Sequence, residues 1–320
     1  MWGRTCMGQV TVKHILRRVF APRPAPPAPR FAATGRLSGM TDGAARSAPA
    51  GPGDIAERLT ALRSRLEDLA PVVVAFSGGA DSAFLAWVAH DVLGPAAAHA
   101  VTAVSPSLAP EEAADCEALV AEWGLRWTPV PTTELADPRY RANDGERCYH
   151  CKAELMAVAG PIAEAEGATV VLGVNLDDLG DHRPGQRAAE ERGAAFPLVD
   201  AGFTKADVRA ASASLGLRTW DKPAAACLAS RVPYGTPVTL GVLREVAAAE
   251  SALRALGFRQ LRVRHYGELA RLELPVDELA AVVARRQEVV AAVAGAGYRY
   301  VTLDLEGFRS GNLNGSLVQG

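Results

Sequence analysis

The feature that most constrains this chain is a short apolar run that leads straight into a loop of small polar residues. PVVVAF (71–76) is uncharged and rich in β-branched residues, which is typical of a strand buried in a parallel sheet. Ser77-Gly78-Gly79-Ala80-Asp81-Ser82 follows it and opens a predicted helix. Glycines let backbone N–H groups approach an anion, and the helix N-terminus adds partial positive charge. The sequence therefore predicts a phosphate-binding loop, with an ordinary tight turn as the alternative.

The pattern around this loop is a repeated alternation of strands and helices. Strands are predicted at 71–76, 99–104, 125–131 and 168–174, and helices at 54–68, 82–92, 110–123, 148–166 and 204–215. Thr204 opens the last of these helices, with Asp207 three residues on, close to a capping box. Strands separated by helices of this length indicate an α/β fold, a Rossmann-like parallel sheet in a doubly wound domain.

The order of the predicted helices and strands changes after residue 239. A helix is predicted at 240–256, a hairpin around Gly267, a long helix at 276–294 and a last strand at 298–305. This αββαβ unit forms a second, smaller domain. The predicted boundaries are a disordered extension at 1–53, a nucleotide-binding domain at 54–232 and the small α/β domain at 239–314.

The first 53 residues hold seven of the 21 prolines and cannot bury enough apolar area to fold. Two interpretations stay open: Met40 is the true start, or the basic segment is an organelle transit peptide. Residues 1–41 carry seven Lys or Arg and no acid, which leaves 27 basic and 36 acidic residues in 42–320. So acidic a folded part is a poor match for nucleic acid. No uncharged run of 18 apolar residues is present, so we expect no membrane span and a cytoplasmic protein.

Three cysteines form the second chemical signal. Cys148 and Cys151 stand as C-x-x-C at a predicted helix start, where positions i and i+3 share one face, and Cys227 lies in a later loop. Spacing alone leaves four interpretations open. These are a zinc site completed by His150, a [4Fe–4S] cluster with one open iron, a dithiol redox pair, and plain buried cysteines. Cys116, on an amphipathic helix face, is predicted to be a core residue.

Charged loops accompany these motifs. GVNLDDLGDHRPG (173–185) follows a predicted strand, at the carboxyl edge where open α/β sheets bind ligands. TWDKPAAACLASRVPYG (219–235) places Lys222 and Arg231 around Cys227, and LDLEGFRSGNLN (303–314) contains Arg309. Each could be a solvated loop. Their occurrence together with a nucleotide loop favours a ligand site.

SGGADS after a buried strand resembles the PP-loop of the ATP pyrophosphatase superfamily. Together with RCYHCK, GVNLDDLGDHRPG, WDKPAAACLASR and LDLEGFRSG, it resembles one subfamily over residues 55–314. This is the ATP-dependent sulfurtransferase acting on pyridinium-3,5-biscarboxylic acid mononucleotide, whose product feeds the nickel-pincer nucleotide cofactor of lactate racemase.

The resemblance implies that ATP adenylates a substrate carboxylate and that a sulfur nucleophile then displaces AMP. It implies ATP bound by Ser77, Gly78, Gly79, Asp81 and Ser82, with Asp81 near Mg²⁺. It further implies catalytic roles for Asp81, Cys148, Cys151 and Cys227, and substrate contacts from Arg183, Lys222, Arg231 and Arg264, with Arg262 and Glu250 as further site residues.

Two variants of the subfamily differ in their sulfur source. In one variant the cysteine at the position of Cys227 gives up its own sulfur, and in the other Cys148, Cys151 and Cys227 would ligate a [4Fe–4S] cluster that carries a transferable sulfide. Three cysteines favour the cluster variant. The expected partners are a small-molecule nucleotide substrate and other copies of the chain, as a homo-oligomer. The competing interpretations are a PP-loop tRNA thiolase and a zinc-binding structural protein with a vestigial nucleotide loop.

Overall fold

The computed structural model describes residues 52–179, 184–224 and 226–309. The predicted extension at 1–53, except for its last two residues, lies outside this part of the chain, and so does Met40.

The larger unit is built on a four-stranded sheet in which all neighbours are parallel, in the order β3-β2-β1-β4. Its strands are β1 (Val72–Ala75), β2 (Ala98–Val104), β3 (Trp127–Pro131) and β4 (Thr169–Leu172). The strand that precedes the glycine loop, β1, lies inside the sheet between β2 and β4. This position explains the apolar run, because an inner strand with both faces covered has no solvent side for polar residues.

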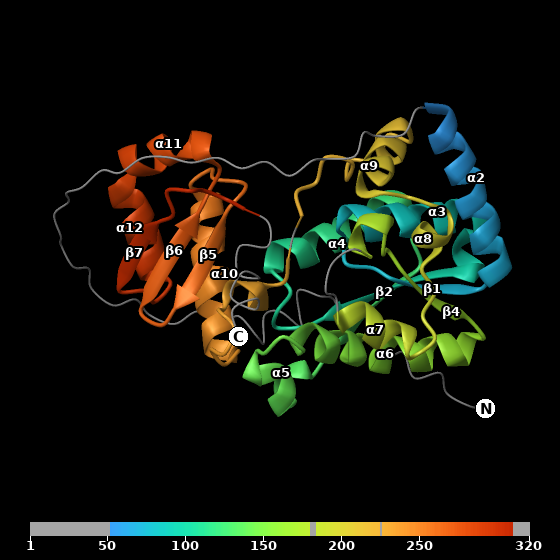
Figure 1. Ribbon diagram of the computed structural model, residues 1–320, viewed down its shortest axis with the longest axis horizontal. Coiled ribbons are helices and arrows are strands. Elements are labelled where there is room, and N and C mark those ends of the chain that lie inside the picture. Colours follow the sequence, from blue (N-terminus) through green and yellow to red (C-terminus); the bar gives the residue numbers. More distant parts are fainter. Residues whose placement is uncertain (1–51, 180–183, 225, 310–320) are drawn as a thin grey trace, which may run out of the picture.

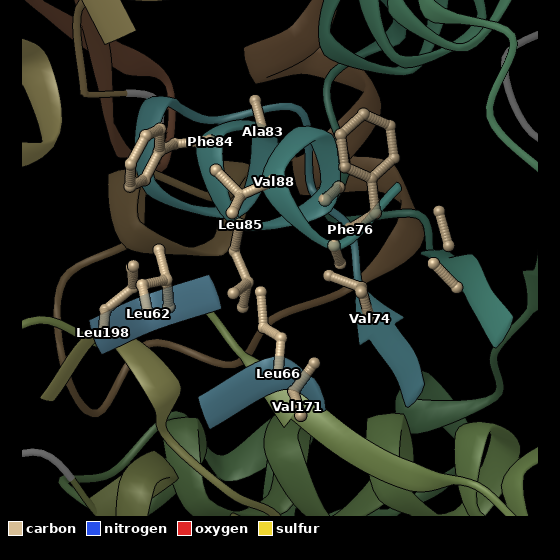
Figure 2. Packing of buried hydrophobic residues seen from close by; sticks show 14 of the residues in the cluster. Leu62, Leu66, Val74, Phe76, Ala83, Phe84, Leu85, Val88, Val171 and Leu198 are labelled. Atoms are coloured by element: carbon tan, nitrogen blue, oxygen red, sulfur yellow. The ribbon is translucent and has the colours of Figure 1, made fainter. Parts of the chain in front are cut away.

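Helices cover both faces of this sheet (Figure 1). The longer ones are α2 (Pro52–Leu69), α3 (Ala80–Ala97), α4 (Pro110–Trp123), α6 (Arg147–Glu166) and α9 (Lys205–Ser214), and the shorter ones are α5 (Pro138–Ala142), α7 (Pro184–Glu190) and α8 (Pro197–Asp200). Val72 and Val74 belong to the core formed with α2, α3 and α8, part of which Figure 2 shows. Val73 points into the second core, under α6. The α/β, doubly wound fold class is thereby confirmed.

The smaller unit is a three-stranded sheet in the order β5-β6-β7, with one antiparallel and one parallel pairing. Its strands are β5 (Arg262–Tyr266), β6 (Leu269–Glu273) and β7 (Tyr300–Leu303), and its main helices are α10 (Leu240–Ala255) and α12 (Arg286–Gly295). Gly267, at φ +65°, stands in the turn of the predicted hairpin. The separate, smaller α/β unit is also confirmed.

The prediction of one continuous helix at 276–294 is wrong. The segment forms a short 3₁₀ turn (Val276–Glu278), then α11 (Leu279–Ala284), then α12, with a break at Arg285. The Arg285 guanidinium donates to the Leu256 carbonyl oxygen at 2.7 Å and lies over the ring of Phe258. This tertiary contact caps the end of α10, and a local helical pattern carries no sign of it.

Short elements that sequence reasoning did not predict occupy the loops at the carboxyl edge of the larger sheet. They include α5, α7 and 3₁₀ turns at Glu134–Ala136, Leu176–Asp178 and Leu228–Arg231. None of the helices in the described ranges combines the length and apolar character needed to cross a lipid bilayer.

Candidate active site

The glycine loop between β1 and α3 is held by its own serines. Ser77 N donates to Ser82 Oγ at 3.2 Å, the two serine hydroxyls lie 3.0 Å apart, and Ser82 Oγ donates to the Gly79 carbonyl oxygen at 3.2 Å. Gly78 has φ +71°, and a Cβ there would lie 2.7 Å from the Cys116 sulfur. Gly78 is therefore required both by its backbone conformation and by the close approach of α4.

Asp81 stands in the first turn of α3 and accepts a hydrogen bond from Asn175 Nδ2 at 3.1 Å. Burial raises the pKa of this carboxyl, and Asp178 adds to the rise, while Lys205 opposes it. Asn175 is fully buried and caps the 3₁₀ turn after β4. The polar residues that follow β4 are thus part of the wall of the nucleotide loop, as expected of the carboxyl edge.

Gly173, at the end of β4, brings a second strand against the same loop. A Cβ at this position would lie 2.8 Å from the Ser82 backbone nitrogen and 2.9 Å from the Asp81 carbonyl carbon. Sequence reasoning missed this glycine because the contact joins residues far apart in the chain. Of the loop at 173–185, Asp181, His182 and the predicted substrate contact Arg183 lie outside the described residues.

The cysteines come together because a buried arginine joins the segments that carry them. Cys148 and Cys151 lie in the first turns of α6, and Cys227 directly precedes the 3₁₀ turn at Leu228–Arg231. Arg147 Nη1 donates to Asn143 Oδ1 at 2.6 Å and to the Ala229 carbonyl oxygen at 2.9 Å. Asn143, fully buried at φ +55°, donates in turn to carbonyl oxygens of the segment after Cys227.

The three thiols influence one another electrostatically. Burial raises the pKa of Cys151 to about 12, and the charges of Cys227 and Cys148 contribute to the rise. Cys148 and Cys227 are exposed, whereas Cys151 is half-buried. Within the residues that the structure describes, no three His, Cys, Asp or Glu side chains form a group that could hold a metal ion as they stand. Cys116 is buried elsewhere, beneath Gly78, as predicted for a core residue.

One pocket of about 450 Å³ joins the nucleotide loop to the cysteines. Its wall includes four cations, of which sequence reasoning singled out only Lys222, and a buried glutamate that it missed. The lining residues that bear on the chemistry are Ser77, Gly79, Ala80, Asp81, Ser82, Glu134, Cys151, Lys152, Lys205, Arg209, Lys222 and Cys227. A cavity of this size is typical of a small-molecule site.

Lys222 connects the segment that leads to Cys227 with the nucleotide loop and with α4. Its Nζ donates to the Gly78 carbonyl oxygen at 3.0 Å and pairs with Asp115 at 2.6 Å and Glu112 at 2.8 Å. Burial alone would lower the pKa of Lys222, but the hydrogen bonds to the two carboxylates raise it overall. The ammonium group is therefore held charged against the nucleotide loop.

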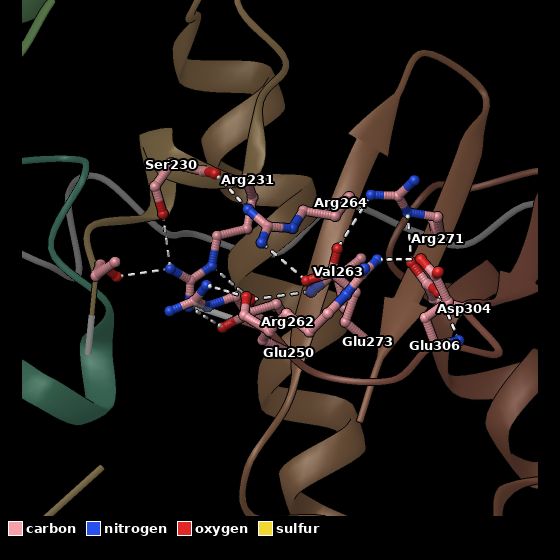
Figure 3. A network of polar contacts seen from close by, with 12 residues as sticks. Ser230, Arg231, Glu250, Arg262, Val263, Arg264, Arg271, Glu273, Asp304 and Glu306 are labelled. Carbon is pink, nitrogen blue, oxygen red and sulfur yellow. Dashed lines mark hydrogen bonds and ion pairs between the residues drawn. The ribbon is translucent and has the colours of Figure 1, made fainter. Parts of the chain in front are cut away.

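Arg231 and Arg264 are placed differently from Lys222, because neither lines the pocket. Arg231 Nε pairs with Glu250 at 2.8 Å, and Arg264 Nη2 pairs with Glu273 at 2.8 Å (Figure 3). Arg264 also donates to the Ser230 carbonyl oxygen at 2.7 Å. The Arg231–Glu250 pair and the hydrogen bond from Arg264 to Ser230 join the segment after Cys227 to the smaller unit. Their predicted role in substrate binding stays a prediction.

The parallel sheet, with its glycine loop at the carboxyl edge of an inner strand, defines a nucleotide-binding domain of the PP-loop type. Residues 55–148 match the NAD synthase family. The chain is 38% identical over 266 residues to the pyridinium-3,5-bisthiocarboxylic acid mononucleotide synthase of Lactiplantibacillus plantarum, covering 83% of this chain and 96% of that protein. It belongs to the same family.

Two further relatives are uncharacterized proteins. The first, from Synechocystis sp., is 47% identical over 266 residues, which cover 82% of this chain and 98% of that protein. The second, from Methanocaldococcus jannaschii, is 30% identical over 169 residues, which cover 52% of this chain and 66% of that protein.

Proposed function

We propose that this chain is an ATP-dependent sulfurtransferase that converts a carboxylate of pyridinium-3,5-biscarboxylic acid mononucleotide into a thiocarboxylate, for nickel-pincer nucleotide synthesis. The observation that carries the proposal is one pocket that is lined both by the nucleotide loop and by Cys151 and Cys227. The name of the Lactiplantibacillus relative, a protein that the chain matches over almost its whole length, supports the substrate class.

The first step is adenylation. A carboxylate oxygen of the substrate bonds to the α-phosphorus of ATP, the bond from that phosphorus to the bridging oxygen breaks, and pyrophosphate leaves. The loop amides and the N-terminus of α3 would hold the pyrophosphate part. Asp81 is the carboxylate placed to bind the accompanying Mg²⁺. Lys205 and Arg209 on α9 line the same pocket and supply positive charge for the phosphates.

In the second step a sulfur nucleophile forms a bond to the activated carbonyl carbon, and AMP leaves with the former carboxylate oxygen. Cys151 and Cys227 line the same pocket as the loop, so an adenylate bound there would present its carbonyl to sulfur. Water must be kept from the adenylate, because hydrolysis would waste ATP.

We propose a [4Fe–4S] cluster with one iron left open as the carrier of the sulfur, because three thiolates leave one iron of such a cluster without a protein ligand. Cys148, Cys151 and Cys227 are free thiols on two segments, and two of them, Cys151 and Cys227, line the pocket, whereas His150 packs edge-on against Tyr149 and is not part of the pocket wall. Cys148, Cys151 and Cys227 would hold the cluster. When bound, it would supply an open iron able to carry an extra sulfide. Arg147, buried beside Cys148, would compensate part of the negative charge of the thiolates.

The proposal is tested with anaerobic protein supplied with ATP, Mg²⁺, sulfide and the biscarboxylate substrate. We expect AMP, pyrophosphate and a thiocarboxylate product, together with iron and sulfide in a ratio that fits one [4Fe–4S] cluster per chain. Cys227→Ala should lose both cluster and product, whereas Cys116→Ala should keep its iron. Formation of ADP would contradict adenylation, and stoichiometric zinc in place of iron would contradict the cluster. The cytoplasmic location and the homo-oligomer stay predictions.

A further inference from the structure

Glu134 is a buried carboxylate whose place in the pocket has no structural explanation. It opens the 3₁₀ turn Glu134–Ala136, which follows β3 at the carboxyl edge of the sheet. The residue is only 3% exposed, yet it lines the pocket. Neither of its side-chain oxygens has a hydrogen-bond partner among the described residues. A carboxylate buried in this way is costly unless something pairs with it.

Two polar side chains near Glu134 are engaged elsewhere. The hydroxyl of Tyr140 lies 2.5 Å from that of Ser107. Glu154, another carboxylate of the same wall, accepts hydrogen bonds from the backbone nitrogen and hydroxyl of Thr133 at 2.8 and 3.0 Å. Leu135, the next residue in the chain, packs against the same buried cluster as Cys151, and Glu134 and Cys151 line the same pocket, so this carboxylate lies near the cysteines. A bound molecule is therefore the natural partner of this carboxylate.

We propose that Glu134 is the counter-ion of the positively charged pyridinium ring when the nucleotide substrate lies against the cysteines. The inference rests on the proposed function, because sulfur can reach a ring carboxylate only if the ring itself lies beside the cysteines. ATP has no positive charge to offer a carboxylate, and its Mg²⁺ belongs with the phosphates at the loop. The anionic groups of the substrate are matched by the cations of the pocket, among them Lys152, which has no ion-pair partner within the described ranges.

The test compares two probes that differ in ring charge. The first is pyridinium-3-carboxylic acid mononucleotide, and the second is its 1,4-dihydro form, which has the same substituents but a neutral ring. Calorimetric titration of the complete protein with each probe, in the presence of a non-hydrolysable ATP analogue, gives the preference for the cation. The wild type should bind the pyridinium form more tightly by about tenfold or more, the range expected for a buried charged contact. Glu134→Gln, which keeps the shape of the side chain, should abolish that preference.

The matched control is Glu154→Gln, since Glu154 lines the same wall but already accepts two hydrogen bonds. It should keep the wild-type preference for the cationic ring. Glu134→Gln should also raise the melting temperature of the ligand-free protein, because it removes an unpaired buried charge.

The outcomes separate the inference from the proposed function. Equal binding of the two probes by the wild type, or an unchanged preference in Glu134→Gln, would overturn the counter-ion role while leaving the sulfur-transfer proposal standing. Failure of the wild type to bind either probe would overturn both. A lower melting temperature for Glu134→Gln would show that the carboxylate serves the fold, and this too would overturn the inference.

Discussion

Lys222 Nζ lies 3.0 Å from the carbonyl oxygen of Gly78, so that the segment leading to Cys227 is fastened directly to the nucleotide loop. The same ammonium group pairs with Glu112 and Asp115 on α4, and its side chain is only 14% exposed. A displacement of either segment must therefore move the other or break a half-buried cluster of charges. This contact couples the place where ATP would bind to the place where sulfur would be delivered.

Replacing Lys222 by Met should impair ATP use more than it impairs folding. The variant loses the bond to Gly78, leaves Glu112 without its partner and leaves Asp115 with Arg218 alone, which should cost about 1–3 kcal/mol in the free energy of unfolding. Because the loop is no longer held, we expect the KM for ATP to rise as well. Urea unfolding and steady-state AMP formation measure the two effects.

Arg218→Met is the matched control for that variant. Arg218 pairs with Asp115 and Glu122 on the same helix but does not contact the loop, and its side chain is 42% exposed. It should lose little stability, as is usual for exposed pairs, and leave the KM for ATP unchanged. An equal rise in KM in both variants would show that α4, rather than the contact with Gly78, positions the loop.

Gly173→Ala should abolish ATP turnover in a protein that still folds. The added methyl group would lie 2.8 Å from the Ser82 nitrogen, and the atoms that it meets belong to the backbone of Asp81 and Ser82, so the start of α3 must shift. Gly160→Ala is the control, because a methyl group at that helical position meets nothing within 4 Å. It should stabilise the protein by up to about 1 kcal/mol through helix propensity. Wild-type AMP formation by Gly173→Ala would contradict the close approach.

Arg231→Met should destabilise the protein by about 3–5 kcal/mol at neutral pH, because it leaves Glu250 buried without its main partner. Glu250→Gln in the same chain should restore part of the loss, since it removes the charge and keeps an acceptor for the Val263 amide. Urea unfolding of the single and double variants measures both effects. A double variant no more stable than the single one would show that packing, not charge, dominates.

The Arg231–Glu250 pair also predicts how the stability lost in Arg231→Met depends on pH. Burial would raise the pKa of Glu250, but Arg231 and Arg254 lower it below the usual 4.5. The lowered pKa stabilises the folded protein fully above about pH 4.5, the usual pKa of the carboxyl. This stabilisation is lost as the pH falls through the lower pKa that Glu250 has in the folded protein. The difference in unfolding free energy between wild type and Arg231→Met should therefore be largest at pH 7 and smaller at pH 4. A deficit that grows toward pH 4 would contradict this account.

The sequence predicted those features of the fold that depend only on residues close together in the chain. The strand–loop–helix unit at 71–92 and the capping box between Thr204 and Asp207 depend on neighbouring residues, and both are confirmed. The continuous helix at 276–294 was wrong because the contact of Arg285 with the end of α10 depends on tertiary packing.

The site itself was only partly predictable. The loop residues and the three cysteines could be singled out because they belong to motifs. Glu134 and Gly173 could not be, because a carboxylate after a strand and a glycine at a strand end are ordinary until folding brings other segments against them. Arginine in a charged loop indicates a ligand site and an interdomain ion pair equally well, and Arg231 is held in such a pair.

Thiol reactivity should follow exposure in cluster-free protein. Cys148 and Cys227 are exposed, so iodoacetamide should modify them first. Cys116 should stay unmodified until the protein unfolds, because burial raises its pKa to about 12. After anaerobic reconstitution with iron and sulfide, Cys148, Cys151 and Cys227 should all be protected, as peptide mass mapping would show. Continued modification of Cys227 in reconstituted protein would remove it from the ligand set.

The central claim is that the three cysteines hold the sulfur donor and that none of them gives up its own sulfur. The intact mass of the protein after turnover tests this claim most directly. Anaerobic protein is allowed to react with ATP, Mg²⁺, sulfide and the biscarboxylate substrate, and the polypeptide is then weighed by mass spectrometry. We predict an unchanged polypeptide mass and more than one thiocarboxylate formed per chain. A mass lower by the elements of H₂S, with dehydroalanine in place of Cys227 in an amount equal to the product, would contradict the claim.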